Sequence, residues 1–127
     1  MTAEVLAFLE GHPGRIALFG AIEAAVEALG GSTLEVRKTQ ISWKNPRLFA
    51  MLSLPPMAQQ RKAGDLMLTF GLGERLDSSR LYQTVEPYPG RWTHHLFLAR
   101  PEEVDGELQG WLADSYRFAQ EKGRRRV

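Results

Sequence analysis

Residues 65–72 read Asp-Leu-Met-Leu-Thr-Phe-Gly-Leu, in which large apolar side chains occupy almost every second position. Because successive side chains of a β-strand point to opposite faces of a sheet, this period of two predicts a strand with Leu66, Leu68 and Phe70 on one face. Met67 then lies on the other face. Which of the two faces the helices cover determines both the fold and the place of a binding surface.

Four more segments have the length and composition of strands. They are residues 33–40, 47–54, 81–86 and 92–99, of which 81–86 has the weakest pattern. Turn sequences such as Pro55-Pro56 and Pro87-Tyr88-Pro89-Gly90 separate them. Connections this short favour antiparallel pairing, since a parallel crossover needs about a dozen residues or more.

Amphipathic helices precede and follow the strands. Residues 15–29 follow Pro13, which suits a first helical turn, and their apolar side chains recur at helical spacing: Ile16, Phe19, Ile22, Val26 and Leu29. The last helix opens at Pro101, and its acidic first turns and basic end match the helix dipole. A short extra helix capped by Thr2 is expected near the N-terminus. The predicted fold class is therefore α+β, with a five-stranded, mainly antiparallel sheet covered on one face by two amphipathic helices.

The bulk composition describes one ordinary globular domain, residues 1–127. Hydrophobic residues make up 43% and charged residues 24%, and the formal charge of +1 gives no overall attraction to nucleic acid or membranes. Residues 1–12 are expected to form an arm or short helix, and residues 123–127 a flexible basic tail. The absence of cysteine excludes disulfides and thiolate chemistry. With no recognisable secretory signal or bilayer-length apolar stretch, the expected location is the cytoplasm.

The sheet face with the larger aliphatic side chains is predicted to be the core, because the two helices must bury their apolar stripes against it. Its residues are Leu34, Val36, Leu48, Ala50, Leu52, Leu54, Leu66, Leu68, Phe70, Leu96 and Leu98. The opposite face carries Arg37, Thr39, Ile41, Trp43, Phe49, Met51, Met67, Thr69, His95 and Phe97. It is more apolar than solvation requires, which is typical of a partner or ligand surface. Alternatively, the N-terminal helix or the 55–62 loop covers it.

Candidate ligand-binding residues lie on this second face and in the turns beside it. They are Arg37, Lys38, Trp43, Phe49, Met67, Arg91, Trp92, His95 and Phe97. Residues 43–47 (WKNPR) combine an aromatic ring with two cations, a set that stacks a base or holds an anion, and Arg91-Trp92 repeats the combination. The alternative is that the tryptophans pack on the sheet and the cations are solvated.

The sequence nominates no catalytic residue, metal-ligand set or cofactor motif. His94 and His95 are neighbours on a strand, so they point to opposite faces and do not chelate one ion together. His94 follows the core face as a buried imidazole, and His95 follows the other face. P-loop, nucleophile-elbow, zinc-helix and EF-hand patterns are absent, so an enzyme is not favoured.

Two stretches resemble a family of small bacterial domains catalogued as domain of unknown function 5655. The first is residues 38–43 (KTQISW) with Phe49, and the second is residues 89–95 (PGRWTHH) with residues 111–116 (WLADSY). The resemblance spans most of the chain and implies no catalytic residues. The element order is also similar to that of YdhG-like and frataxin-like sandwiches, which implies iron handling or DNA binding. The frataxin acidic ridge is reduced here to Glu23, Glu27 and Glu35, a departure that argues against iron.

Three functions follow from these observations. The leading hypothesis is a non-enzymatic binding module that uses the second face and the Trp43/Arg91 region to hold a protein segment, a nucleic acid or a small anionic ligand. The second is metal handling, chiefly of iron, through scattered carboxylates and His95. The third is a structural domain that homodimerises through the same face. No membrane partner is expected.

Overall fold

The computed structural model describes residues 1–124 of the chain, with side chains through Glu121. Its helical elements are α1 (Ala3–Phe8), α2 (Gly14–Glu27), α3 (Ala58–Ala63), the 3-10 turn η1 (Pro101–Glu103) and α4 (Gly106–Arg124). Its strands are β1 (Thr33–Val36), β2 (Gln40–Lys44), β3 (Leu48–Ser53), β4 (Leu66–Leu72), β5 (Gln83–Tyr88) and β6 (Arg91–Leu98). Residues 125–127 of the predicted basic tail lie outside the described residues, whereas Gly123 and Arg124 belong to α4.

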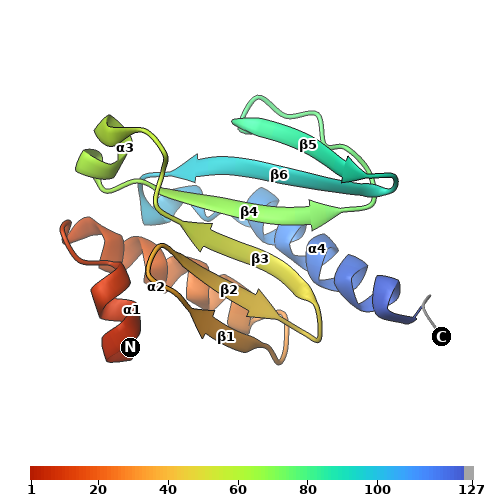
Figure 1. Cartoon of the computed structure of the whole chain (residues 1–127), viewed down its shortest axis with the longest axis horizontal. Coiled ribbons are helices and arrows are strands. Elements are labelled where there is room, and N and C mark those ends of the chain that lie inside the picture. The colour runs from red at the N-terminus through yellow and green to blue at the C-terminus, as the bar shows by residue number, and fades with distance from the viewer. Residues whose placement is uncertain (125–127) are drawn as a thin grey trace.

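The strands form one sheet of six strands in the order β1-β2-β3-β4-β6-β5, and every pairing is antiparallel. Helices α2 and α4 lie behind this sheet, and the face toward the viewer in Figure 1 has no helix across it. The α+β class, the antiparallel sheet and its two covering helices are as predicted. The number of strands is not, because the predicted strand 33–40 is replaced by the hairpin of β1 and β2, turning at residues 37–39.

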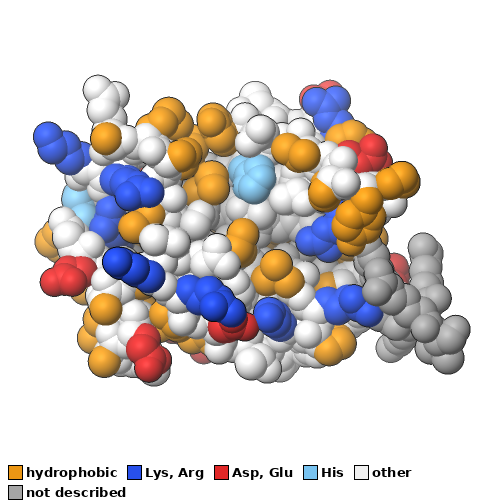
Figure 2. Space-filling model, in the orientation of Figure 1, with side chains coloured by type: hydrophobic (Ala, Val, Ile, Leu, Met, Phe, Trp, Pro, Cys, Tyr) orange, Lys and Arg blue, Asp and Glu red, His pale blue; other side chains and the backbone are white. Residues whose placement is uncertain are grey.

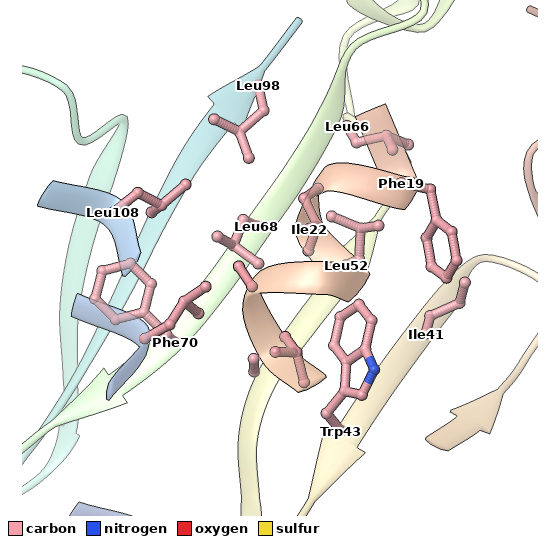
Figure 3. Close-up of a cluster of buried hydrophobic side chains, with 14 of the residues drawn as sticks. Phe19, Ile22, Ile41, Trp43, Leu52, Leu66, Leu68, Phe70, Leu98 and Leu108 are labelled. Atoms are coloured by element: carbon pink, nitrogen blue, oxygen red, sulfur yellow. The ribbon is translucent and has the colours of Figure 1, made fainter. Parts of the chain in front are cut away.

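The core fills the space between the sheet and the two long helices (Figure 3). Helix α2 contributes Phe19 and Ile22, and α4 contributes Leu108, all at 0% exposure. The strands contribute core side chains that are each at most 2% exposed: Ile41, Leu52, Leu66, Leu68, Phe70, Leu96 and Leu98. Burial of each such side chain stabilises the fold by roughly 1.5–3 kcal/mol. Ile16, predicted in the buried stripe of α2, is instead 46% exposed.

The β1–β2 hairpin reverses the face predicted for two residues. Ile41 pairs with Val36 and Trp43 with Leu34, so all four side chains lie on the helix-covered face. Ile41 is 0% and Trp43 3% exposed, and the Trp43 indole stacks on the Phe19 ring. The expectation that Ile41 and Trp43 face away from the helices is therefore wrong, because the chain turns between β1 and β2 instead of continuing in one strand.

A β-bulge in β3 exchanges the faces of two more residues. Trp43 pairs with Ala50 and Lys44 with Leu48, which leaves Phe49 as the extra residue on β3. The Phe49 ring turns to the helix side, where it is 2% exposed and meets the Tyr116 ring edge-on at 5.0 Å. The predicted exposed position of Phe49 and the predicted core position of Leu48 are thus both wrong.

Helix α4 closes over this bulge with a buried serine. The Ser115 hydroxyl donates to the Phe49 carbonyl at 2.6 Å and accepts from the Gly71 N–H at 3.3 Å. Ser115 is 1% exposed, so one side chain satisfies polar backbone groups of β3 and β4 that water does not reach. The end of the sheet is tied further by Asn45, which donates to the Gly31 carbonyl and to the Tyr116 hydroxyl.

The two short helices lie at one end of the sheet and not across its face (Figure 1). The Thr2 hydroxyl caps α1 by accepting from the Val5 N–H at 3.2 Å, as predicted, and Val5 joins the core. The predicted 55–62 loop contains α3, which ends at Gly64 with a φ of 86°. Arg15 joins these parts, since its guanidinium donates to the carbonyls of Glu10 and Arg61.

Candidate functional site

One face of the sheet carries the candidate site, and we call the face turned away from α2 and α4 the open face. A row of residues crosses it from edge to edge through the registers of five strand pairs: Glu35, Ser42, Met51, Thr69, His95 and Gln83. Figure 2 shows a histidine near the middle of this face, with hydrophobic side chains about it and Lys and Arg side chains in a row over β1 and β2.

Arg91 is the first residue of β6 and pairs with Tyr88 of β5, and its guanidinium lies against the backbone of β4. A Cβ placed on Gly71 would meet the Arg91 guanidinium at 2.8 Å, so the guanidinium occupies the space that only glycine leaves open. Beside it is a hollow of about 20 Å³, lined on this face by Leu48, Met51 and Thr69. No ion pair of the described residues includes Arg91, which leaves its charge available to an anion.

His95 lies four residues from Arg91 on the same face of β6 and is half-buried. Its Nδ1 atom is 2.8 Å from the Thr69 hydroxyl, and Thr69 is itself 7% exposed. Burial lowers the pKa of His95 from its ordinary value of 6.5, so the neutral imidazole predominates at pH 7. The pair therefore offers hydrogen-bonding groups beside Arg91 without adding a second full charge.

An apolar patch continues the open face toward β5. Phe97 pairs with Met67 across β6 and β4, and the Tyr82 ring lies against Phe97 with centroids 4.6 Å apart. Tyr82 is 51% and Val85 40% exposed, so the patch presents aromatic and aliphatic surface to solvent. We define the apolar patch as Met67, Tyr82, Val85 and Phe97.

The other half of the open face is basic. We define the basic row as Arg37, Lys38, Lys44 and Arg47, from β2 and the turns that flank it. Lys44 and Arg37 both pair with Glu35. The hydrogen bond from Lys44, and to a lesser extent that from Arg37, holds the pKa of Glu35 below its ordinary value. Among the described residues, Lys38 and Arg47 form no ion pair, so the row keeps a net positive charge.

The structure brings together six of the residues nominated from the sequence and removes three. Met67, Arg91, His95 and Phe97 lie on the open face, with Arg37 and Lys38 beside it in the β1–β2 turn. Trp43 and Phe49 are core residues, as described above. Trp92 pairs with Leu72 and shares the side of β6 that bears the fully buried His94, so it faces the helices.

Sequence reasoning missed Tyr82, Leu48 and the seat that Gly71 provides. Tyr82 precedes β5, where the alternation of apolar and polar residues is weak. The bulge that exposes Leu48 contains no glycine that would mark it in the sequence. Gly71 did carry a signal, because a glycine inside a strand marks the close approach of another group.

His94 is buried on the opposite side of β6 and does not contribute to the open face. Its Nε2 atom accepts from the Leu76 N–H at 3.0 Å, and its ring stacks on Phe70 at 5.1 Å. Burial lowers the pKa of His94 from 6.5, which keeps the imidazole neutral inside the core. His94 is therefore a structural residue.

Two larger cavities lie off the open face. One, of about 450 Å³, is lined by alanines of α2 with Val104 and Gln109, and the other, of about 330 Å³, lies between residues 72–76 and the second half of α4. Within residues 1–124 no group of three or more histidine or acidic side chains is placed to hold a metal ion. In that same part of the chain no helix combines the length and apolarity needed to cross a membrane.

Comparison with known proteins identifies a family without an assigned activity. The family described as "Domain of unknown function (DUF5655)" matches residues 8–119, and the chain belongs to it. No curated protein and no solved structure matches the chain significantly.

Proposed function

We propose that this DUF5655 domain is a non-enzymatic binding module whose open face holds an anionic partner, with Arg91 as its central contact. The observation that carries the proposal is the guanidinium seated on Gly71 with no acidic partner among the described residues. An arginine on a sheet face without an acidic partner has its planar donors free for a phosphate or carboxylate.

The surroundings of Arg91 fit this role. On one side the basic row attracts negative charge, and on the other the apolar patch supplies contact area that an ion alone does not use. Between them, the Thr69 hydroxyl and the His95 imidazole provide neutral hydrogen-bonding groups 2.8 Å apart. A mixed surface of this kind favours a ligand with both anionic and apolar parts.

The alternatives from the sequence find less support. Metal handling requires several ligands that converge, and no three of the described carboxylates and histidines do so. Neither the metal nor the dimer reading explains why Arg91 rests on glycine.

A titration of the full chain with inorganic tripolyphosphate, followed by amide chemical shifts, tests the proposal. We expect shifts concentrated at Thr69, Gly71 and Arg91, and about five- to tenfold weaker binding for Arg91→Gln, which removes one charge-assisted contact. Arg117→Gln is the matched control, because Arg117 lies on α4 and pairs with Asp114.

A second variant separates the position of the guanidinium from its charge. Gly71→Ala keeps Arg91 but occupies the space in which its guanidinium lies, since the new Cβ would be 2.8 Å from the guanidinium. We expect weaker binding with an unchanged fold, because the displaced atoms are the far end of a flexible side chain. Shifts confined to α2 and α4, or equal affinities for all variants, would reject the proposed function.

A further inference from the structure

The open face has the shape of a surface for an extended chain. The hollow beside Arg91 measures about 20 Å³, whereas sites that enclose small molecules usually measure about 300–1,000 Å³. The two larger cavities described above lie elsewhere on the molecule and include none of the residues of the apolar patch or basic row. A flexible polymer laid across the strands, in contrast, needs no enclosing walls.

The chemistry of the face narrows the class of polymer. Phe97 pairs with Met67 on β4, and the Arg91 guanidinium lies against Gly71, four residues further along the same strand. At about 3.4 Å per residue, these four residues separate the ring from the guanidinium by roughly 14 Å along β4. The polymer must therefore present a flat apolar group at one point and an anion some distance away.

From these observations we infer that the partner is single-stranded nucleic acid, an inference that rests on the proposed function. In this arrangement a base stacks on the exposed Tyr82–Phe97 pair, and backbone phosphates follow Arg91 and the basic row. Because one nucleotide does not span from the ring to the guanidinium, a strand of at least two nucleotides is required. The hydrogen-bonding groups of Thr69 and His95 lie between the two contacts.

Duplex recognition fits the face less well. Proteins that read a duplex commonly insert a helix into the major groove, and both long helices of this domain lie on the opposite side of the sheet (Figure 1). Stacking on Tyr82 and Phe97 also requires unpaired bases. An acidic peptide would satisfy the cations but would leave the exposed aromatic pair without a flat partner.

The charges predict a modest and salt-dependent affinity. Arg91, Lys38 and Arg47 have no acidic partner among the described residues, while Arg37 and Lys44 share Glu35. Three available cations correspond to a slope of about −2 in the logarithm of the affinity against that of the salt concentration, at about 0.7 per phosphate neutralised on a single strand. The formal charge of the chain is only +1, so binding depends on this local row.

Fluorescence anisotropy of the full chain with labelled twelve-nucleotide oligothymidylate and oligouridylate tests the inference. We expect both oligomers to bind more tightly than tripolyphosphate of equal charge concentration and far more tightly than uridine monophosphate. Phe97→Leu keeps apolar volume but removes the ring, and we expect about tenfold weaker oligonucleotide binding with unchanged tripolyphosphate binding. Ile16→Ala is the control, because Ile16 is 46% exposed on α2, away from the open face.

The outcomes separate this inference from the function on which it rests. Oligonucleotides that bind no better than tripolyphosphate, with Phe97→Leu without effect, would overturn the nucleic-acid inference and leave an anion-binding face. A dimer that Phe97→Leu dissociates would overturn the inference as well, since a second copy would then cover the patch. Absence of any anion binding that depends on Arg91 would overturn both.

Discussion

Replacing Phe49 by alanine in one variant and Phe97 by alanine in another tests whether one sheet face is covered and the other is not. Phe49 is 2% exposed and packs edge-on against Tyr116 at 5.0 Å, so its removal leaves a cavity inside the core. Truncation of a buried phenylalanine costs about 3–5 kcal/mol of unfolding free energy. Phe97 is half-buried and touches Tyr82, so we expect its loss to cost about 1–1.5 kcal/mol.

Urea denaturation followed by circular dichroism measures both values. With a total stability of about 5–15 kcal/mol, Phe49→Ala should lower the transition midpoint by a large fraction, and at the lower end of this range should leave part of the chain unfolded without denaturant. Phe97→Ala should shift the midpoint slightly with an unchanged slope. Equal losses for the two variants would refute the reasoning, because they would mean that Phe97 is covered as completely as Phe49.

Three further perturbations follow from individual contacts. Arg80→Gln should lower stability by about 1 kcal/mol in urea unfolding, because the partly exposed Arg80 pairs with Asp105, just before α4, and with Glu107 in its first turn, and lies 5.5 Å from the Trp111 ring centre. A loss no larger than that of Arg117→Gln would contradict this. Lowering the pH from 7 to 5 should reduce the unfolding free energy, because the pKa of the buried His94 is lowered in the folded state and the unfolded chain therefore binds more protons below pH 6.5. His94→Gln should reduce this pH dependence by at most about 1.4 kcal/mol per pH unit. An unchanged dependence would count against a neutral buried imidazole. Ser115→Ala should lower the unfolding free energy by about 1–3 kcal/mol in thermal or urea unfolding, because the Phe49 carbonyl and the Gly71 N–H lose their hydrogen-bond partner. Ser115→Thr restores a hydroxyl and should lower the unfolding free energy by less.

The sequence predicted the sheet wherever alternation is regular. In β4 and β6 the residues expected in the core, such as Leu68, Phe70 and Leu96, are at most 2% exposed, and Met67 and Phe97 face away from them. Period-two alternation reports directly on which face is buried, so these strands needed no further information.

The errors lie where the chain changes direction without a local signal. Residues 37–39 (RKT) form the β1–β2 turn with neither glycine nor proline. The alternation therefore predicts one continuous strand here and assigns Trp43 to the wrong face of the sheet. The bulge at Phe49 likewise involves ordinary residues, and only pairing with β2 shows it. Both features depend on contacts between strands, which a single sequence does not display.

The candidate site was predicted in part for the same reason. His95 and Phe97 follow from the regular alternation of β6, and their position on the open face could be inferred without coordinates. The position of Arg91 on Gly71 depends on the pairing of β4 with β6, and Tyr82 reaches Phe97 through the course of the loop before β5. Contacts that depend on how the strands and loops pair in three dimensions therefore could not be predicted from the alternation of residues along the chain.

The contacts of α4 have a consequence for synthesis on the ribosome. This helix supplies the buried Leu108, Leu112 and Ala119, and its Ser115 and Tyr116 bond to the chain near residues 31, 45, 49 and 71. A nascent chain that has emerged only as far as β6 therefore exposes the apolar surface of β3 and β4 that α4 later covers. Folding must wait for about the last twenty residues described, and during that interval the strands depend on chaperones or on rapid translation to avoid aggregation.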